Sequence, residues 1–296
     1  MDVYEKITNE FIKIIESTGK LPWQRGWGGN GLEFAVSYST GKAYNFLNQC
    51  LLGFEGGEWI TFAQCEKLGG KVKKGAKAKV IYGCIKKTKT VTNKDGEEET
   101  KTYWLYRYSN VFNVRDCEGI KPKNEIPEKV KEEFVANETA DGIIADYVER
   151  TGVRFISKQM ILGFECPHYT PSLDEVVVPK KEQFDSPSAY YSTTFHELVH
   201  STLKEDRCNR KSENELSHFG NEQYSKEELV AELGSAIIMA RLGMDNENEK
   251  MNQAAYLKSW LSALKNDTKM LISASSKAEK AVKFIMNEKT ETAEVA

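Results

Sequence analysis

The chain has 296 residues, 40% of them hydrophobic and 29% charged, which is enough for one large domain or two domains with separate cores. It contains no apolar run as long as a membrane span and no N-terminal secretory signal, so we expect a cytoplasmic protein outside the membrane. The six cysteines include no C-x-x-C pair, which argues against a zinc ribbon or a disulfide framework.

The N-terminal part of the chain predicts helices followed by a small antiparallel sheet. Hydrophobic residues recur at helical spacing over residues 2–18, and the apolar pattern of residues 58–68 also indicates a helix. From Lys71 onward the pattern alternates as in strands, with a polar hairpin tip over residues 92–99. We therefore interpret residues 1–117 as an α+β domain.

Lysines are concentrated in this first domain. Nine of them lie between Lys67 and Lys89 without any acidic residue, and tryptophans and tyrosines surround the run. Lysines bind phosphates as point charges, and exposed aromatic rings stack on unpaired bases, so the pattern predicts a surface for single-stranded nucleic acid. A basic hairpin over an aromatic core would have the same composition. The candidate contact residues are Lys71, Lys73, Lys74, Lys77, Lys79, Trp27 and Tyr44.

Residues 118–138 are polar and contain two prolines, which is typical of a linker, so we expect a second domain over residues 139–290. This domain is predicted to be mostly helical. A short strand over residues 173–178 is expected at a sheet edge, where it could pair with an extended peptide. The predicted helices cover residues 140–150, 186–203, 225–242, 248–266 and 267–287.

The second domain contains the motif H-E-x-x-H, formed by His196, Glu197 and His200. On a helix, a spacing of four residues places both imidazoles on one face, where they can bind a divalent metal, most often zinc. Glu197 would act as the general base toward water. Because this short motif also occurs by chance in unrelated chains, a third ligand is needed to support it.

Two glutamates on the next predicted helix are candidates for the third ligand. Glu228 and Glu232 are four residues apart and interrupt an apolar surface, and a buried carboxylate requires a partner. We assign Glu228 as the ligand and Glu232 as the acceptor of a hydrogen bond from a ligand histidine. The reverse assignment stays open, as does a role for Glu228 in capping a helix that starts at Ser225.

Longer motifs follow one another along nearly the whole chain. They comprise Trp23 and Trp27 and residues 39–48, 59–64, 69–77, 189–200, 224–234 and 254–261. In this order they resemble the ArdC-type antirestriction proteins, which pair an N-terminal single-stranded-DNA-binding domain with a C-terminal zincin-like metallopeptidase domain. The resemblance implies that His196 and His200 are metal ligands and that Glu197 is the catalytic glutamate. It does not decide between Glu228 and Glu232.

Together these observations predict an α+β antirestriction protein of a mobile element that binds single-stranded DNA and carries a zinc metallopeptidase-type site. Zn²⁺ is the expected metal, with another divalent metal as the alternative. A different hypothesis is a soluble zinc metallopeptidase whose N-terminal domain recognises a protein substrate. A third hypothesis is that the metal site has no turnover and the protein acts by binding DNA alone. The H-E-x-x-H motif favours an enzyme, a zinc-dependent metallopeptidase, but the sequence does not decide the question.

Overall fold

The computed structural model describes residues 2–22, 34–92, 98–123, 136–161, 166–184, 186–210, 222–244 and 253–288. They divide into two compact units. The described residues within Met1–Phe11 and Glu33–Pro127 belong to the first unit, and those within Ile12–Leu32 and Glu128–Glu291 belong to the second. Most of the expected linker, 118–138, lies outside the described residues, so the expected domain boundaries stay a prediction.

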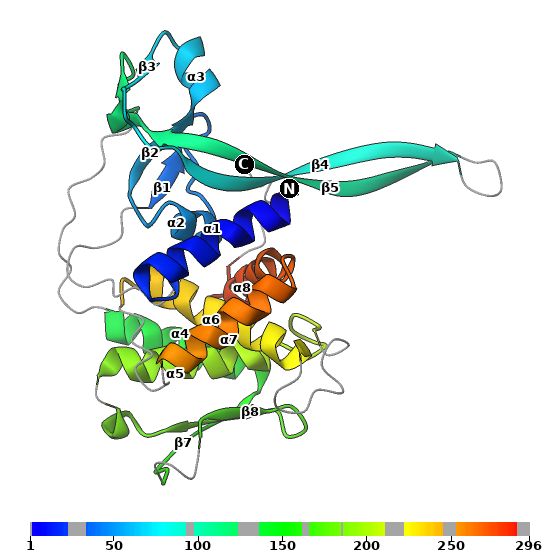
Figure 1. Ribbon diagram of the computed structural model, residues 1–296. Helices are drawn as coiled ribbons and strands as arrows, with labels where there is room; N and C mark the ends of the chain where they lie inside the picture. Colours follow the sequence, from blue (N-terminus) through cyan, green and yellow to red (C-terminus); the bar gives the residue numbers. More distant parts are fainter. Residues whose placement is uncertain are drawn as a thin grey trace. The chain divides into compact units, whose positions relative to one another are not determined.

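The first unit is built on a four-stranded sheet in the order β1-β2-β5-β4, with a two-stranded sheet of β3 and β6 beside it (Figure 1). β1 pairs with β2 in parallel, and the other neighbours in the larger sheet are antiparallel. The expected antiparallel sheet is therefore present with one parallel strand added at its edge. The elements are the start of α1 (Val3–Thr18), β1 (Ala35–Ser37), α2 (Phe46–Leu51), β2 (Gly57–Thr61), α3 (Phe62–Lys67), β3 (Lys71–Val72), β4 (Lys79–Thr92), β5 (Glu98–Asn113), a 3-10 turn (Val114–Asp116) and β6 (Cys117–Glu118).

The helix predicted over residues 58–68 was wrong in its first part, which forms β2. Trp59 and Ile60 are both buried, in two separate hydrophobic clusters, because both faces of this central strand are covered. A strand buried on both faces has the same continuous apolar pattern as a short buried helix. The helix α3 starts only after Thr61, whose side chain forms a reciprocal capping box with Gln64.

Side-chain amides fix α2 to its neighbours. Asn48 accepts a hydrogen bond from the backbone N–H of Tyr82 at 2.9 Å and donates one to its carbonyl at 2.8 Å. Gln49 does the same with the backbone of Ala35, at 2.9 Å in both directions. These buried amides replace backbone pairing, so α2 is held against both β4 and β1.

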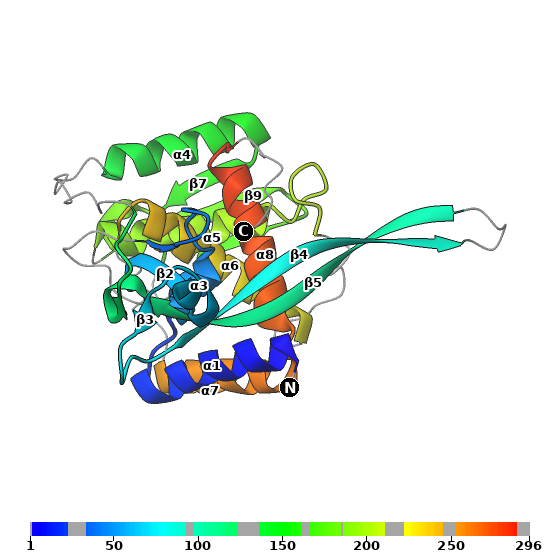
Figure 2. The same cartoon turned by 90° about the horizontal axis from the view of Figure 1, so that it is seen from above.

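The strands β4 and β5 form a long hairpin, which Figures 1 and 2 show as a twisted two-stranded ribbon. The pairing runs from Lys79 opposite Val111 to Thr92 opposite Glu98. Near its base, the face with Tyr106 contacts the Tyr4 ring of α1, at 5.5 Å between ring centroids. Most of the predicted hairpin tip, residues 92–99, lies outside the described residues.

The second unit combines a three-stranded sheet with helices. The sheet order is β7-β9-β8, so the strand predicted at a sheet edge is in fact the central one. It pairs in parallel with β7 and antiparallel with β8, and its edges are therefore not free for a peptide. The elements are α4 (Ala136–Thr151), β7 (Arg154–Lys158), β8 (His168–Thr170), β9 (Glu175–Pro179), a 3-10 turn (Lys181–Gln183), α5 (Pro187–Ser201), α6 (Glu222–Arg241), α7 (Gln253–Asn266) and α8 (Met270–Ile285).

The helices of this unit form layers over the sheet: α5 packs on β8 and β9, α6 packs on α5, and α8 packs on α6. The helices α5 and α6 approach each other closely at Gly234, where an added Cβ would lie 2.7 Å from Cγ2 of Val199. The fold class predicted from the sequence, α+β with a mostly helical second part, is confirmed. Among the described helices, none has the combination of length and apolar character that a membrane span requires.

Candidate metal centre

The H-E-x-x-H motif lies on α5, close to the predicted range. Ser186 caps the helix by accepting a hydrogen bond from the backbone N–H of Ala189 at 3.1 Å, and Pro187 occupies the first turn, where its missing N–H costs nothing. The helix then continues without a break, so the four-residue spacing brings His196 and His200 to one face, with ring centroids 4.7 Å apart.

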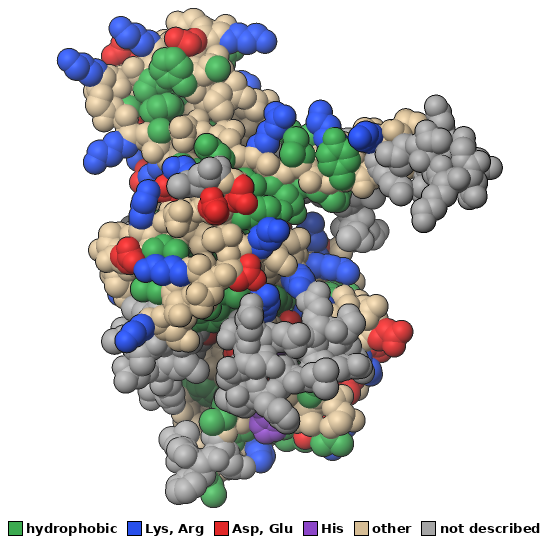
Figure 3. Space-filling view, turned by 45° about the vertical axis from the view of Figure 1, so that its right-hand side comes forward, with side chains coloured by type: hydrophobic (Ala, Val, Ile, Leu, Met, Phe, Trp, Pro, Cys, Tyr) green, Lys and Arg blue, Asp and Glu red, His purple; other side chains and the backbone are tan. Residues whose placement is uncertain are grey.

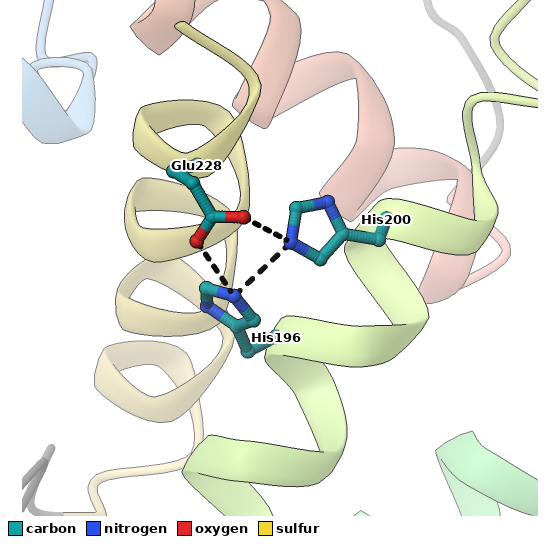
Figure 4. Close-up of side chains that lie close together, drawn as sticks. All are labelled: His196, His200 and Glu228. Carbon is teal, nitrogen blue, oxygen red and sulfur yellow. Dashed lines mark hydrogen bonds and ion pairs between the residues drawn. The ribbon is translucent and has the colours of Figure 1, made fainter. Parts of the chain in front are cut away.

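The side chains of His196, His200 and Glu228 converge, with one donor atom of each lying within 4.8 Å of the others (Figure 4). The two Nε2 atoms are 3.1 Å apart. Glu228 on α6 places Oε2 3.5 Å from Nε2 of His196 and Oε1 3.3 Å from Nε2 of His200. Two imidazole nitrogens and a carboxylate oxygen that point at one another fit a divalent metal and leave room for a further ligand.

The other glutamates predicted for this site are buried beside it. Glu197 is 7% exposed and Glu232 is 6% exposed. The negative charge of Glu197 acts on both imidazoles, and that of Glu232 acts on His196. The geometry thus brings Glu228 to the two Nε2 atoms, and it places Glu232 near His196. The assignment of ligand and supporting residue stays a prediction.

Glu228 on α6 and the two histidines on α5 stabilise one another's charged forms. Burial opposes protonation of His196, but the hydrogen bond to Glu228 outweighs it and raises the pKa of His196 above 6.5. For His200, burial is likewise outweighed by Glu227 and Glu228, and the pKa of His200 rises to about 10. Burial would raise the pKa of Glu228, yet both histidines hold it well below 4.5. The glutamate is therefore ionised, and binding of a cation would compete with protonation of the imidazoles.

Two residues beside this cluster have no role in the sequence interpretation: Glu227 and Arg210. Oε1 of Glu227 lies 3.6 Å from Nδ1 of His200, on the opposite side of the ring from Glu228. Arg210 donates to the same oxygen from Nη2 at 2.9 Å and to Oε2 from Nε at 3.3 Å. Arg210 also bonds Thr202 Oγ1 and the carbonyl of Val199, so it fixes α6 to the end of α5. Only the adjacency of Glu227 to Glu228 could have drawn attention to it.

A second network of charges holds the C-terminal end of α5. Arg207, whose side chain is 1% exposed, donates to the carbonyl of Ser201 at 2.8 Å and to Oδ2 of Asp174 at 2.6 Å. Lys204 donates to the same carboxylate at 2.8 Å, and Tyr169 donates to its other oxygen at 3.0 Å. The turn before β9 is thereby fixed to the helix that carries the histidines.

Two family models match separate parts of the chain. The model for the N-terminal domain of anti-restriction factor ArdC matches residues 1–112, and the zincin-like metallopeptidase model matches residues 148–277. The uncharacterized protein y4eC of Sinorhizobium fredii (strain NBRC 101917 / NGR234) is 30% identical over 94% of this chain and 89% of its own length. The chain belongs to the ArdC antirestriction family.

Solved structures agree with this membership. The crystal structure of the antirestriction ArdC protein from plasmid R388, in its metal-free form, is 27% identical with a TM-score of 0.70 and covers 97% of both chains. Its Mn(II)-bound form is 25% identical with a TM-score of 0.67, over 99% of this chain and 100% of that one. A DNA primase TraC of Escherichia coli is 30% identical over 96% of this chain, which spans only 27% of the length of that primase.

The residues predicted to contact nucleic acid have different environments in the first unit. Lys71, Lys74 and Lys77 are exposed. The ammonium of Lys79 bonds the carbonyl of Leu52 at 2.7 Å and pairs with Glu55, and that of Lys73 bonds the carbonyl of Arg115 at 2.8 Å. Tyr44 is half-buried against the cluster around Trp59, and Trp27 lies outside the described residues. Their role in binding stays a prediction.

Proposed function

We propose that this chain is an antirestriction protein that binds single-stranded DNA through its N-terminal unit and carries a metal-dependent hydrolase-type site in its second unit. The convergence of His196, His200 and Glu228 within 4.8 Å supports the site more than any other observation. Membership in the ArdC family, together with the basic and aromatic composition of residues 67–108, supports the DNA-binding function.

In this proposal His196, His200 and Glu228 hold the metal. A divalent metal bound there acidifies water and polarises a carbonyl group. Glu197 is buried, lies on the same helix as both histidines, and is the carboxylate that accepts a proton from the attacking water and passes it to the leaving amine. Arg210 and Glu227 hold His200 from the side opposite Glu228, so that its Nε2 stays directed at the site.

Zinc is the metal that we propose. The H-E-x-x-H spacing and the set of two imidazoles and one carboxylate suit zinc, and nitrogen and oxygen ligands bind Zn²⁺ more tightly than Mn²⁺ at equal free concentrations. The related ArdC structure that contains Mn(II) makes manganese the competing choice. Metal exchange with equal amounts of both ions, followed by elemental analysis, should give zinc. Retention of manganese would contradict the zinc assignment.

Titration of the full chain with labelled single-stranded and double-stranded oligonucleotides tests the DNA-binding function. We expect preference for the single strand and a steep loss of affinity as salt rises, because phosphate contacts release counterions. Equal affinity for both forms would contradict the preference. The absence of binding would instead favour a metallopeptidase whose N-terminal unit recognises protein.

Whether the hydrolase-type site acts in protection is tested with Glu197→Gln, which keeps the shape of the side chain and removes its basicity. We expect this variant to fold and bind metal normally and to lose protection against restriction. If protection is intact, the chain acts by binding DNA alone and the metal site has a structural role.

A further inference from the structure

The β4–β5 hairpin has an unusual concentration of exposed hydrophobic and basic residues. Tyr103 is 48% exposed, Trp104 53% and Tyr108 46%, and all three lie on β5, with Ile85 of β4 41% exposed beside them. Figure 3 shows basic and hydrophobic side chains side by side along this ribbon. A large apolar side chain held this far out in water contributes little to the core, so these rings are available to a partner.

The register pairs each outer ring with a lysine. Trp104 lies opposite Lys86, and Tyr103 lies opposite Lys87. Residues that face each other across two strands point to the same side of the sheet, and neighbouring residues point to opposite sides. One face of the ribbon therefore presents the ring of Trp104 next to the ammonium group of Lys86, and the other face presents Tyr103 next to Lys87. All four side chains are exposed.

The charge of the hairpin fits a polyanion. The strands β4 and β5 contain two acidic residues, Glu98 and Glu99 at the tip end of β5, and six basic residues: Lys79, Lys86, Lys87, Lys89, Lys101 and Arg107. Before the hairpin and at its first residue, by contrast, Lys73 and Lys79 already bond carbonyl groups of the protein, and the ring of Trp59 beside Lys79 is buried. The combination of exposed rings and exposed ammonium groups occurs on the hairpin.

We propose that the β4–β5 hairpin is the surface on which single-stranded DNA binds, a proposal that rests on the DNA-binding function proposed above. Trp104 and Tyr103 stack on bases, and Lys86 and Lys87 contact the phosphates beside them. Stacking requires a base with a free face, which a single strand offers and a duplex hides within its own stack. The hairpin thereby explains a preference for single strands without readout of sequence.

The test measures affinity of the full chain for a fluorescently labelled oligodeoxythymidine over a range of salt concentrations. Trp104→Leu keeps an apolar side chain and removes the ring, and we expect it to weaken binding about tenfold, whereas Trp104→Phe keeps most of the affinity. Phe62→Ala is the matched control, because Phe62 on α3 is 51% exposed, and it should leave affinity unchanged. Unfolding curves of each variant confirm that the hairpin variants fold.

A second pair of variants separates the hairpin from general charge. Lys86→Gln with Lys87→Gln and Lys74→Gln with Lys77→Gln each remove two exposed positive charges. We expect the hairpin pair to weaken binding more and to reduce the salt slope by about 0.7 for each phosphate that a lysine no longer neutralises.

Equal losses from both lysine pairs, or full affinity of Trp104→Leu, would overturn the hairpin proposal while leaving DNA binding itself intact. If the wild type binds no single-stranded DNA, the proposed function fails first. Loss of protection in the hairpin variants with unchanged DNA affinity would mean that the hairpin contacts a protein, which also overturns the proposal.

Discussion

The helix pair α5–α6 and the hairpin β4–β5 both carry charged residues next to aromatic or apolar ones, but their burial differs. At the helix pair, Arg210, which follows α5, has a side chain that is 6% exposed, and Glu227 of α6 has one that is 11% exposed. The two charges lie within bonding distance of each other. On the hairpin, Lys86 and Lys87 are exposed next to rings that are about half exposed. Buried charges must be paired in a fixed geometry, whereas exposed charges cost little and can select a ligand.

This difference predicts large effects on stability for the helix pair and small ones for the hairpin. Arg210→Met should have the largest effect. It removes the guanidinium that forms two hydrogen bonds with the nearly buried carboxylate of Glu227 and should lower the free energy of unfolding by about 3–5 kcal/mol, measured by urea unfolding. The double variant Arg210→Met with Glu227→Gln should recover part of that loss. If Arg210→Met alone changes the free energy of unfolding by less than about 1 kcal/mol, the pair of Arg210 and Glu227 is not buried in solution.

Asp174→Asn should have the second-largest effect on the free energy of unfolding. Burial alone would raise the pKa of Asp174, but hydrogen bonds from Lys204 and Arg207 lower it below its usual 3.8. The stability due to ionised Asp174 is therefore fully present above pH 3.8 and is lost as the pH falls through the depressed pKa. We expect a cost of about 2–3 kcal/mol at neutral pH.

Asparagine keeps the size of the side chain and tolerates the positive φ of this residue, 48°, so the comparison isolates the charge. The gap in unfolding free energy between wild type and Asp174→Asn should narrow in acid. If the difference in unfolding free energy between wild type and Asp174→Asn is the same at neutral pH and well below pH 3.8, the lost stability does not come from the charge of Asp174.

Gly234→Ala tests the close contact of α5 and α6. The added methyl would meet Cγ2 of Val199 at 2.7 Å, so the helices must separate, at a cost of about 1–2 kcal/mol in thermal or urea unfolding. Gly142→Ala on α4 is the matched control. A Cβ there meets nothing within 4 Å, and the better helix propensity of alanine should stabilise the protein by up to about 1 kcal/mol. Equal effects of the two substitutions would refute the close contact.

The smallest effect is expected on the hairpin. Lys86→Gln with Lys87→Gln should change the free energy of unfolding by no more than about 0.5 kcal/mol per residue, because both side chains are exposed. The same variant is expected to weaken DNA binding. A stability loss as large as that of Arg210→Met would mean that these lysines serve the fold and that the two regions do not differ as described.

The sequence predicted the helix of His196 and His200 well, because the four-residue spacing is a local signal. The structure adds two further local features at its start, the Ser186 cap and Pro187 in the first turn. The sequence also pointed to Glu228, since a carboxylate in an apolar helix surface requires a partner. It could not find the pairing of Arg210 with Glu227, because those residues are brought together only when α6 packs on α5.

Two errors in the predicted fold have a similar physical cause. The pattern of residues 58–68 suggested one helix because β2 is buried on both faces and loses the alternation of a strand. The strand β9 was expected at an edge, since no local signal shows that β7 and β8 pair on either side of it. The start of α6 at Glu222 rather than near Ser225 also removes the capping role considered for Glu228.

Metal analysis of the purified protein shows whether His196, His200 and Glu228 form a metal site. The wild type, His196→Ala, Glu228→Gln and Glu232→Gln are loaded with Zn²⁺, dialysed and compared by elemental analysis and by unfolding curves. We expect metal in the wild type, its loss in His196→Ala and Glu228→Gln, and an affinity about 10- to 100-fold weaker in Glu232→Gln. Full metal content in a folded Glu228→Gln variant, or no metal in the wild type, would contradict this expectation.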